Sequence, residues 1–209
     1  MRTMDLKHIN KTQPHHQPKL ILASASPRRA DLLREAGFSF GIAPSSVVEA
    51  IRPGESPVDF ALRMALEKAL EVARKSALGG IFVLGADTIV CLGGRIYGKP
   101  KDASEARAFL SELSGKTHDV ITGYAMVEGP DKIKNQGYAA SHVTLARLTP
   151  EEIAAYVATG EPIDKAGAYA AQGIGRKMIE KIEGSFTNVV GLPMEDIKPL
   201  LEALPLWPS

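Results

Sequence analysis

Apolar and polar positions repeat with two different spacings along the chain, which indicates that strands and helices occur in one protein. Apolar runs bounded by turn residues predict strands at 20–23, 38–43, 81–84 continuing through 89–92, 117–127 and 137–148. Helical spacing and helix start and stop residues predict helices over 27–36, 57–77, 103–114, 150–159 and 194–204. The two types alternate in the first third, and the middle is richer in strand-type sequence. The pattern predicts an α/β fold with a mixed sheet.

The segment from Leu20 to Gly37 predicts a strand, a turn of small residues and a helix. We expect Ser26 to cap the helix with its side chain, and Pro27 suits the first helical position. Arg28 and Arg29 follow in the first turn, where positive charge opposes the helix dipole unless an anion lies between them. Because free amides at a helix N-terminus bind anions, this turn is a candidate anion site. The plain alternative is that both arginines project into solvent or pair with acidic residues of the same helix.

Two charged residues stand in apolar surroundings. Lys68 lies on the apolar stripe of the long predicted helix, which makes it a candidate functional residue. The alternative to a functional role is that its stem is buried and its ammonium group reaches water. Asp87 interrupts a strand-like apolar run, where a carboxylate is costly to bury unless it is paired or bound to a metal. Its alternative is an aspartate in a bulge marked by Gly85, bonded to its own backbone.

A glycine-rich stretch from Gly93 to Lys99 has the spacing of a phosphate-binding P-loop, but we reject that interpretation. Pro100 stands where the motif requires Ser or Thr, so no hydroxyl is available for a magnesium ion. The paired glycines at 93 and 94 instead predict a hairpin turn. Lys99 stays a candidate for binding phosphate as a point charge from a loop.

The segment 164–176 is rich in small residues, and Gly173 and Gly175 invite close backbone approach. Gln172 offers a donor and an acceptor, as an amide that reads the edge of a base would. For the two glycines, a plain turn is the alternative. Further along, Pro199 predicts a kink or a restart in the last helix.

Composition and charge limit the binding partners and the cellular location that the sequence predicts. The 209 residues include 25 basic and 24 acidic ones, so the net charge of +1 supplies no field for nucleic acid or an anionic membrane. Residues 1–18 are polar and predict a disordered tail with an incidental His15-His16 pair, and 19–209 are expected to form one domain. The only cysteine, Cys91, stands in an apolar strand, which predicts an unreactive thiol and a cytoplasmic location.

These residues together predict phosphate chemistry with a divalent metal. Arginine and lysine side chains would hold a polyphosphate, while Glu49 and Asp87 supply hard oxygen ligands for Mg²⁺ or Mn²⁺. The metal would neutralise phosphate charge and lower the pKa of an attacking water. From the residues alone we expect a hydrolase that acts on phosphate esters or anhydrides.

Several ordered motifs resemble the Maf family of nucleoside triphosphate pyrophosphatases. They are SASPRR at 24–29, EKA at 67–69, GADTIV at 85–90, GKP at 98–100, SGKTHDVITG at 114–123, DKAGAYAAQG at 164–173 and EGSFTNVVGLP at 183–193. The resemblance covers about 19–204 and implies a two-lobed, mixed α/β fold with flanking helices and a cleft, similar to the inosine-triphosphate pyrophosphatases. It also implies hydrolysis of a nucleoside triphosphate between the α- and β-phosphates, which gives a monophosphate and pyrophosphate.

The resemblance implies roles for particular residues. It assigns phosphate or metal binding to Ser24, Arg29, Lys68, Lys99 and, for the metal, Glu49. Asp87 falls on the aspartate that accepts a proton, and the sequence leaves open whether it acts mainly as a metal ligand instead. Arg28, Thr88 and Gln172 match specificity positions of the branch that hydrolyses dTTP and UTP.

Two other functions stay open at this point. One is hydrolysis of 7-methylguanosine triphosphate, which a second branch of the same family performs. The other is a non-catalytic, nucleotide-binding regulator of cell division, although such a regulator would have no need of Glu49 and Asp87. The sequence leaves the oligomeric state undecided, with a homodimer as one option.

The chain departs from the family pattern at two places. Ala25 replaces the usual glycine of the turn, which matters only where that residue needs a positive φ. Glu49 is flanked by Val48 and Ala50, so the acidic pair of the family pattern is reduced to one residue and a second metal ligand beside Glu49 is left open. We therefore expect metal affinity or stoichiometry to differ from the family pattern.

Overall fold

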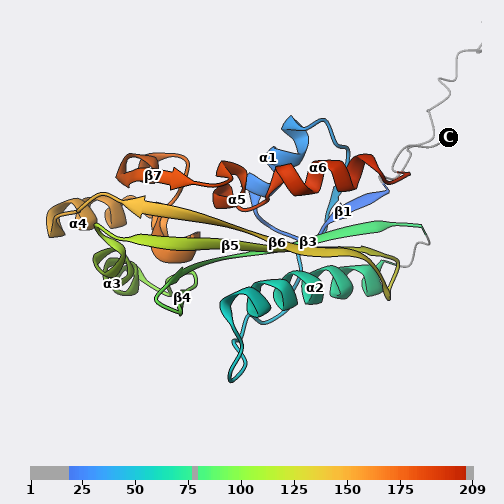
Figure 1. The fold of residues 1–209 in the computed structure, drawn as a ribbon, viewed down its shortest axis with the longest axis horizontal. Helices are drawn as coiled ribbons and strands as arrows, with labels where there is room; N and C mark the ends of the chain where they lie inside the picture. Colours follow the sequence, from blue (N-terminus) through green and yellow to red (C-terminus); the bar gives the residue numbers. More distant parts are fainter. Residues whose placement is uncertain (1–18, 77–79, 206–209) are drawn as a thin grey trace, which may run out of the picture.

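The computed structural model describes residues 19–76 and 80–205, and it contains one seven-stranded sheet in the order β2-β1-β3-β5-β6-β7, with β4 paired to β3. Figure 1 shows α2 along one face of the sheet, α1, α5 and α6 over the opposite face, and α3 and α4 at one end. This arrangement confirms the predicted α/β fold with a mixed sheet. The predicted tail at 1–18 lies outside the described residues.

The parallel part of the sheet is formed by β1 (Leu20–Leu22), β2 (Gly41–Ile42) and β3 (Phe82–Leu92). The helix α1 (Pro27–Glu35) connects β1 to β2, as predicted, with proline at its first position. The strand predicted at 38–43 is much shorter than expected. Parallel neighbours need such a crossover, which explains why the strand-turn-helix pattern was recognisable in the sequence.

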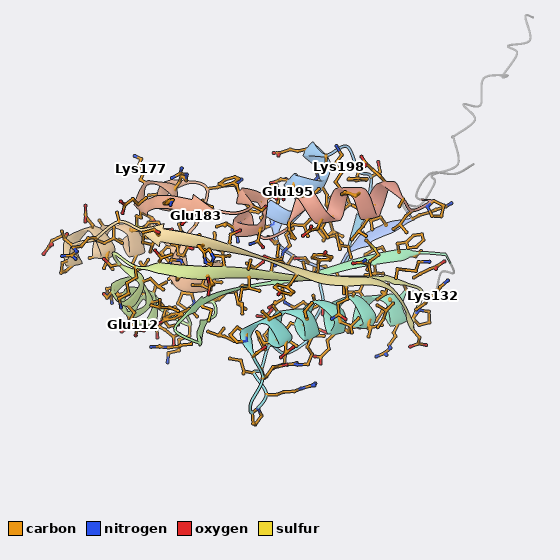
Figure 2. The ribbon with its side chains drawn as sticks, viewed as in Figure 1. Glu112, Lys132, Lys177, Glu183, Glu195 and Lys198 are labelled. Carbon is orange, nitrogen blue, oxygen red and sulfur yellow. The ribbon has the colours of Figure 1, made fainter. Side chains whose placement is uncertain are left out.

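The antiparallel part consists of two short strands and two long ones. They are β4 (Arg95–Tyr97), β5 (Thr117–Glu128), β6 (Lys132–Leu145) and β7 (Ile179–Glu183). The hairpin turn predicted at the 93–94 glycine pair is confirmed, and residues 129–131 connect β5 to β6. Strand β6 begins and ends earlier than the predicted 137–148. Only residues 142–145 of β6 pair with β7, so among the described residues the first part of β6 is a sheet edge. Figure 2 places Lys132 at the far end of this edge from α4.

Within the described residues, four of the remaining five α-helices follow the predicted start and stop residues closely, and the short helix at 186–190 was not predicted. The five are α2 (Pro57–Lys75), α3 (Ala103–Leu113), α4 (Pro150–Ala158), α5 (Phe186–Val190) and α6 (Met194–Glu202). Thr149 and Glu152 form a reciprocal capping box at the start of α4. The helix α6 runs through Pro199 as one element, so the predicted restart there is wrong. The last residue predicted for α2, at position 77, lies outside the described residues.

Two glycines let α2 lie directly on the sheet. A Cβ atom at Gly85 of β3 would lie 2.2 Å from the carbonyl oxygen of Ala65, and one at Gly123 of β5 would lie 2.3 Å from that of Ala61. Any larger residue at either position would push the helix away. Pairing of β3 with β5 is continuous from Phe82 to Cys91, so the alternative of a bulge at Gly85 is wrong and the glycine serves close packing instead.

The main apolar core lies on the face of the sheet covered by α1, α3, α4 and α6, and a smaller cluster lies under α2. Cys91 is buried in β3 as a free thiol, and burial raises its pKa, as expected for an unreactive cysteine. None of the helices within 19–76 and 80–205 is long and apolar enough to cross a membrane.

Candidate active site

One cavity of about 600 Å³ brings together the nine candidate site residues named from the sequence. Its lining contains Ser24, Arg28, Arg29, Glu49, Lys68, Asp87, Thr88, Lys99 and Gln172. They come from the β1–α1 turn, the loop before α2, α2, β3, the loop after β4 and the segment after α4. Residues that are far apart in sequence therefore share one site.

The floor of the cavity holds a lysine between two carboxylates. Lys68 Nζ donates to Glu49 Oε1 at 2.6 Å and to Asp87 Oδ1 at 2.5 Å. Lys68 and Asp87 are only 9% and 4% exposed, so the alternatives of a solvated lysine and of a bulge aspartate are both wrong. Lys68 follows Ala65 by one helical turn and Asp87 follows Gly85 on the same strand face. The close packing of helix on strand at Gly85 thus sets the distance between the two charges.

The two carboxylates of this cluster differ in acidity. Burial raises the pKa of Asp87 above its ordinary value, and the charge of Lys68 only partly opposes this effect. Burial also acts on Glu49, but the hydrogen bond and charge of Lys68 outweigh it and hold the pKa of Glu49 below the ordinary value. Asp87 is therefore the stronger base of the two, which suits a group that accepts a proton.

Arg29 uses most of its donors within the protein. Its Nε donates to Gly191 O at 2.7 Å, and its Nη1 donates to Ser24 Oγ at 3.1 Å and to Ala86 O at 2.9 Å. Its Nη2 donates to Thr88 Oγ1 at 2.9 Å. Within the described residues no carboxylate lies within salt-bridge distance of this guanidinium, and burial lowers its pKa. Arg29 therefore ties α1, β3 and the loop after α5 together and places one positive charge behind the turn.

The N-terminus of α1 opens toward the same cavity. Ser26 does not cap it, because its side chain makes no capping hydrogen bond, and the predicted cap is wrong. Instead, Ser26 N donates to Ser24 Oγ at 3.2 Å, and the amides of residues 28 and 29 have no partner within the described part of the chain. Ala25 has no positive φ, so the alanine is tolerated where the family pattern has glycine. Free amides and a helix dipole are what an anion site requires.

Further cations stand at the rim. Arg28 Nη1 lies 3.6 Å from Asp164 Oδ2, and Lys99 lines the cavity from the loop after β4. Lys165 also lines it, with its ammonium paired to Asp164 and donating to Glu161 O at 3.4 Å. Sequence reasoning missed Lys165, although it stands inside the DKAGAYAAQG motif quoted for the family. A positive charge in a motif of small residues was the available signal.

Thr88 faces inward more than toward a ligand. Its hydroxyl accepts from Arg29 and shares a hydrogen bond of 2.9 Å with the hydroxyl of Thr122. Thr122 in turn donates to Asn188 O at 3.1 Å. Gln172, by contrast, is exposed at the rim, and its side chain has no hydrogen-bond partner within 19–76 and 80–205. The predicted specificity residues therefore comprise a half-buried threonine, a paired arginine and one available amide.

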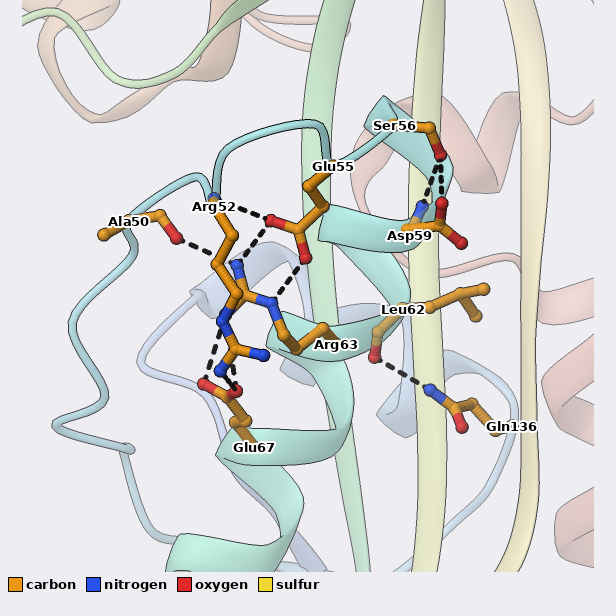
Figure 3. A network of polar contacts seen from close by, with 9 residues as sticks. All are labelled: Ala50, Arg52, Glu55, Ser56, Asp59, Leu62, Arg63, Glu67 and Gln136. Atoms are coloured by element: carbon orange, nitrogen blue, oxygen red, sulfur yellow. Dashed lines mark hydrogen bonds and ion pairs between the residues drawn. The ribbon is translucent and has the colours of Figure 1, made fainter.

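The loop that carries Glu49 is held by a charged cluster around Arg63 of α2 (Figure 3). Arg63 Nη2 donates to Ala50 O at 2.9 Å, and the guanidinium binds both oxygens of Glu55, at 2.5 and 2.6 Å. The hydrogen bonds from Arg63 hold the pKa of Glu55 at about 2. Because Ala50 directly follows Glu49, this cluster fixes the backbone beside the carboxylate that reaches Lys68.

The acidic groups of the site are few. Within the described residues no group of three or more His, Cys, Asp and Glu side chains is arranged to hold a metal ion. Glu49 and Asp87 both bind the Lys68 ammonium, and Val48 beside Glu49 is 81% exposed. Mg²⁺ is commonly held by one or two carboxylates together with substrate phosphates, so this pair fits an ion that arrives with a polyphosphate.

Comparison with known proteins identifies the family of the chain. The Maf family profile, described as Maf-like protein, matches residues 19–204. The chain is 47% identical over 198 residues to the dTTP/UTP pyrophosphatase of Syntrophotalea carbinolica, covering 93% of this chain and 89% of that protein. It is 48% identical over 185 residues to the dTTP/UTP pyrophosphatase of Geotalea uraniireducens, covering 88% of this chain and 94% of that protein. A solved HAM1 protein from Coxiella burnetii aligns with a TM-score of 0.49 and 17% identity, over 88% of this chain and 98% of that chain.

Proposed function

Because the chain belongs to the Maf family, we propose that it is a nucleoside triphosphate pyrophosphatase that hydrolyses dTTP and UTP to the monophosphate and pyrophosphate. The observation that carries this proposal is the buried cluster in which Lys68 joins Glu49 and Asp87 at the floor of a cavity lined by cations and free helix amides. Such a cavity binds a polyphosphate and places a base beside it.

Binding of the triphosphate uses the positive groups around the cavity. The free amides at the start of α1, with Arg29 behind them, hold one phosphate group. Lys68 and Lys99 supply point charges to the others. Lys165 adds a further cation that the motif comparison did not single out. These charges stabilise the negative charge that develops as the anhydride bond breaks.

Asp87 accepts the proton of the attacking water in this proposal. Its raised pKa makes it a stronger base than an exposed aspartate, while the charge of Lys68 favours its ionised form. The water oxygen adds to phosphorus, the bond between the α- and β-phosphates breaks, and pyrophosphate leaves with the electron pair. Lys68 then balances the charge of the site while the proton lies on Asp87.

We further propose that Glu49 and Asp87 hold a divalent cation, Mg²⁺ or Mn²⁺, together with phosphate oxygens of the substrate. When bound, the ion neutralises phosphate charge and lowers the pKa of a bound water. Two carboxylates satisfy only part of an octahedral shell, so the substrate must complete it. The ion is therefore expected to bind tightly only with the nucleotide.

The proposed base-reading groups are Arg28, Thr88 and Gln172. Uracil and thymine present an imide N–H between two carbonyl groups, and the Gln172 amide can both donate to and accept from that edge. Gln172 is exposed at the cavity rim and free to do so. Close relatives named dTTP/UTP pyrophosphatase favour this substrate over 7-methylguanosine triphosphate and over a non-catalytic role. The lone buried Cys91 supports a reducing, cytoplasmic location.

Pyrophosphate release from dTTP, UTP, CTP and 7-methylguanosine triphosphate, each with Mg²⁺ or Mn²⁺, tests the proposal. Wild type should release pyrophosphate and monophosphate from dTTP and UTP, and Asp87→Asn should lose this activity by about 10²–10⁴-fold. Asp119→Asn, an exposed aspartate paired with His142, is the matched control. Turnover of only the methylated guanine nucleotide would replace the substrate, and tight nucleotide binding without turnover would favour the regulator.

A further inference from the structure

The wall of the cavity that carries Gln172 has little regular structure. It follows α4 as three short 3₁₀ turns, η1 (Glu161–Asp164), η2 (Ala166–Ala168) and η3 (Ile174–Met178). Ala168 has a φ of 60°, which non-glycine residues rarely adopt, and it is fully buried. Backbone held in such a conformation persists only where surrounding contacts enforce it. Some group must therefore fix this segment.

The carboxylate of Glu161 supplies one of those contacts. Glu161 Oε1 accepts from Ile174 N at 3.1 Å, and Oε2 accepts from Gly175 N at 2.9 Å. Gly173 has a φ of 75°, and a Cβ atom there would lie 2.2 Å from Glu161 Oε1. The two glycines thus serve an internal anion, since their backbone wraps around a side chain of the same protein.

Tyr156 of α4 supplies a second contact on the other side of Gln172. Its hydroxyl accepts from Ala170 N at 3.1 Å, and a Cβ atom at Gly175 would lie 2.4 Å from that hydroxyl. The Tyr156 hydroxyl is therefore packed against both ends of the segment. Gln172 lies between Ala170 and Ile174, so both of its flanking backbone positions are held from α4 and its C-terminal end.

We propose that Glu161 is a positioning residue for base selection, which holds the backbone on which Gln172 reads the pyrimidine. This inference rests on the proposed hydrolysis of dTTP and UTP. Glu161 does not itself line the cavity, so its effect on the substrate passes through the backbone amides of Ile174 and Gly175. Loss of these two bonds should leave the chemistry at Asp87 in place and weaken discrimination between bases.

The test compares Glu161→Gln with Glu151→Gln, which neutralises an exposed carboxylate in the first turn of α4. In Glu161→Gln the side-chain NH₂ group faces one of the two backbone N–H groups, so one of the hydrogen bonds to Ile174 N and Gly175 N is lost. We expect the ratio of kcat/KM for UTP to that for CTP to fall about tenfold in Glu161→Gln, since the misplaced amide no longer matches the imide edge. The control should keep the wild-type ratio.

Hydrogen exchange gives a readout that is independent of turnover. In wild type the amides of Ile174 and Gly175 should be protected, and in Glu161→Gln their protection and that of Ala170 should be lost while β5 stays protected. An unchanged UTP to CTP ratio with lost protection would overturn the role in base selection. Unchanged protection would show that Glu161 does not hold the amides of Ile174 and Gly175. Absence of UTP hydrolysis in wild type would instead contradict the proposed function, and the exchange result would still test these contacts.

Discussion

Asp87 and Gln172 line the same cavity, but different kinds of structure hold them there. Asp87 stands in the middle of β3, whose pairing with β5 runs without interruption from Phe82 to Cys91. Gln172 stands in a segment of short turns that contains a strained alanine and is held by the Glu161 carboxylate. The group proposed for chemistry is thus fixed by the sheet, whereas the group proposed for recognition depends on side-chain contacts.

This difference teaches where each function tolerates change. A strand in the centre of a sheet holds its side chains through many backbone hydrogen bonds, so the position of Asp87 does not depend on one residue. A loop held by one carboxylate can shift when that carboxylate changes, and the base preference can shift with it. Single substitutions around Asp87 and around Gln172 are therefore expected to cause different losses of activity and of base preference.

The largest expected effect comes from removing the cation that joins the carboxylates. Lys68→Met should lower kcat by about 10²–10³-fold, because the developing phosphate charge loses a buried donor. The variant leaves Asp87 beside Glu49 without the opposing charge, which raises the pKa of Asp87 further, so the acidic limb of the rate profile should move to higher pH. Lys75→Met, a surface lysine of the same helix, should change neither property. An unmoved acidic limb would argue against Asp87 as the base.

Acid should lower the free energy of unfolding through a buried histidine that contacts Tyr169, a residue of the cavity lining near Gln172. His118 is 2% exposed and shares a 2.7 Å hydrogen bond with Tyr169, and burial lowers its pKa to about 4. The unfolded state binds a proton near pH 6.5 and the folded state does not, so stability falls as pH drops toward 4, by about 3 kcal/mol.

Urea unfolding of wild type and His118→Gln at several pH values checks this prediction. The two proteins should differ in their pH dependence between pH 6.5 and 4, whereas His142→Gln, at an exposed position, should behave as wild type. If the free energy of unfolding of His118→Gln depends on pH as strongly as that of wild type, groups other than His118 cause the acid sensitivity.

Gly85→Ala should push α2, which carries Lys68, away from β3, which carries Asp87. The added methyl group meets Ala65 O and the Ala69 side chain, at 2.2 and 2.9 Å, so α2 must shift. We expect the free energy of unfolding to fall by about 1–3 kcal/mol and the activity to fall with it, because Lys68 moves with the helix. Gly98→Ala has open space around its Cβ position and serves as the control for stability. Unchanged stability of Gly85→Ala would contradict the close packing.

The smallest expected effect concerns the loop of Glu49. Arg63→Lys removes the bidentate contact with Glu55 and the contact with Ala50 O, since a lysine cannot reproduce the planar fork. The metal concentration for half-maximal rate should rise about tenfold as Glu49 loses its fixed position. Arg74→Lys, at an exposed position on the same helix, should leave it unchanged. A metal response identical to wild type would mean that the loop keeps its place without Arg63.

Much of this site could be predicted because charge in apolar surroundings leaves a mark in sequence. Lys68 and Asp87 were recognisable for this reason, and the structure brings them into contact. Proline and glycine marked the helix ends for a similar local reason. The nine selected residues share one cavity, while their catalytic and binding roles stay predictions until they are measured.

The rest depended on contacts with backbone, which carry no signature in the sequence. Arg29 makes its shortest hydrogen bond to Gly191 O, far along the chain, and any residue could supply that carbonyl. A bulge was one alternative at Gly85, because a bulge and close helix packing both favour glycine, and only the approach of α2 distinguishes them. Glu161 was missed because its partners are amide groups of Ile174 and Gly175.

The open edge of β6 has a consequence for behaviour in concentrated solution. An unpaired strand can recruit the same strand of another molecule and begin aggregation. Here Lys132 and Lys134 lie at that edge and bind Glu128, and the pairing of β5 with β6 shifts register between Met126 and Val127. Charge and an irregular twist both obstruct edge-to-edge addition, so this strand can stay uncovered without making the protein prone to form fibres.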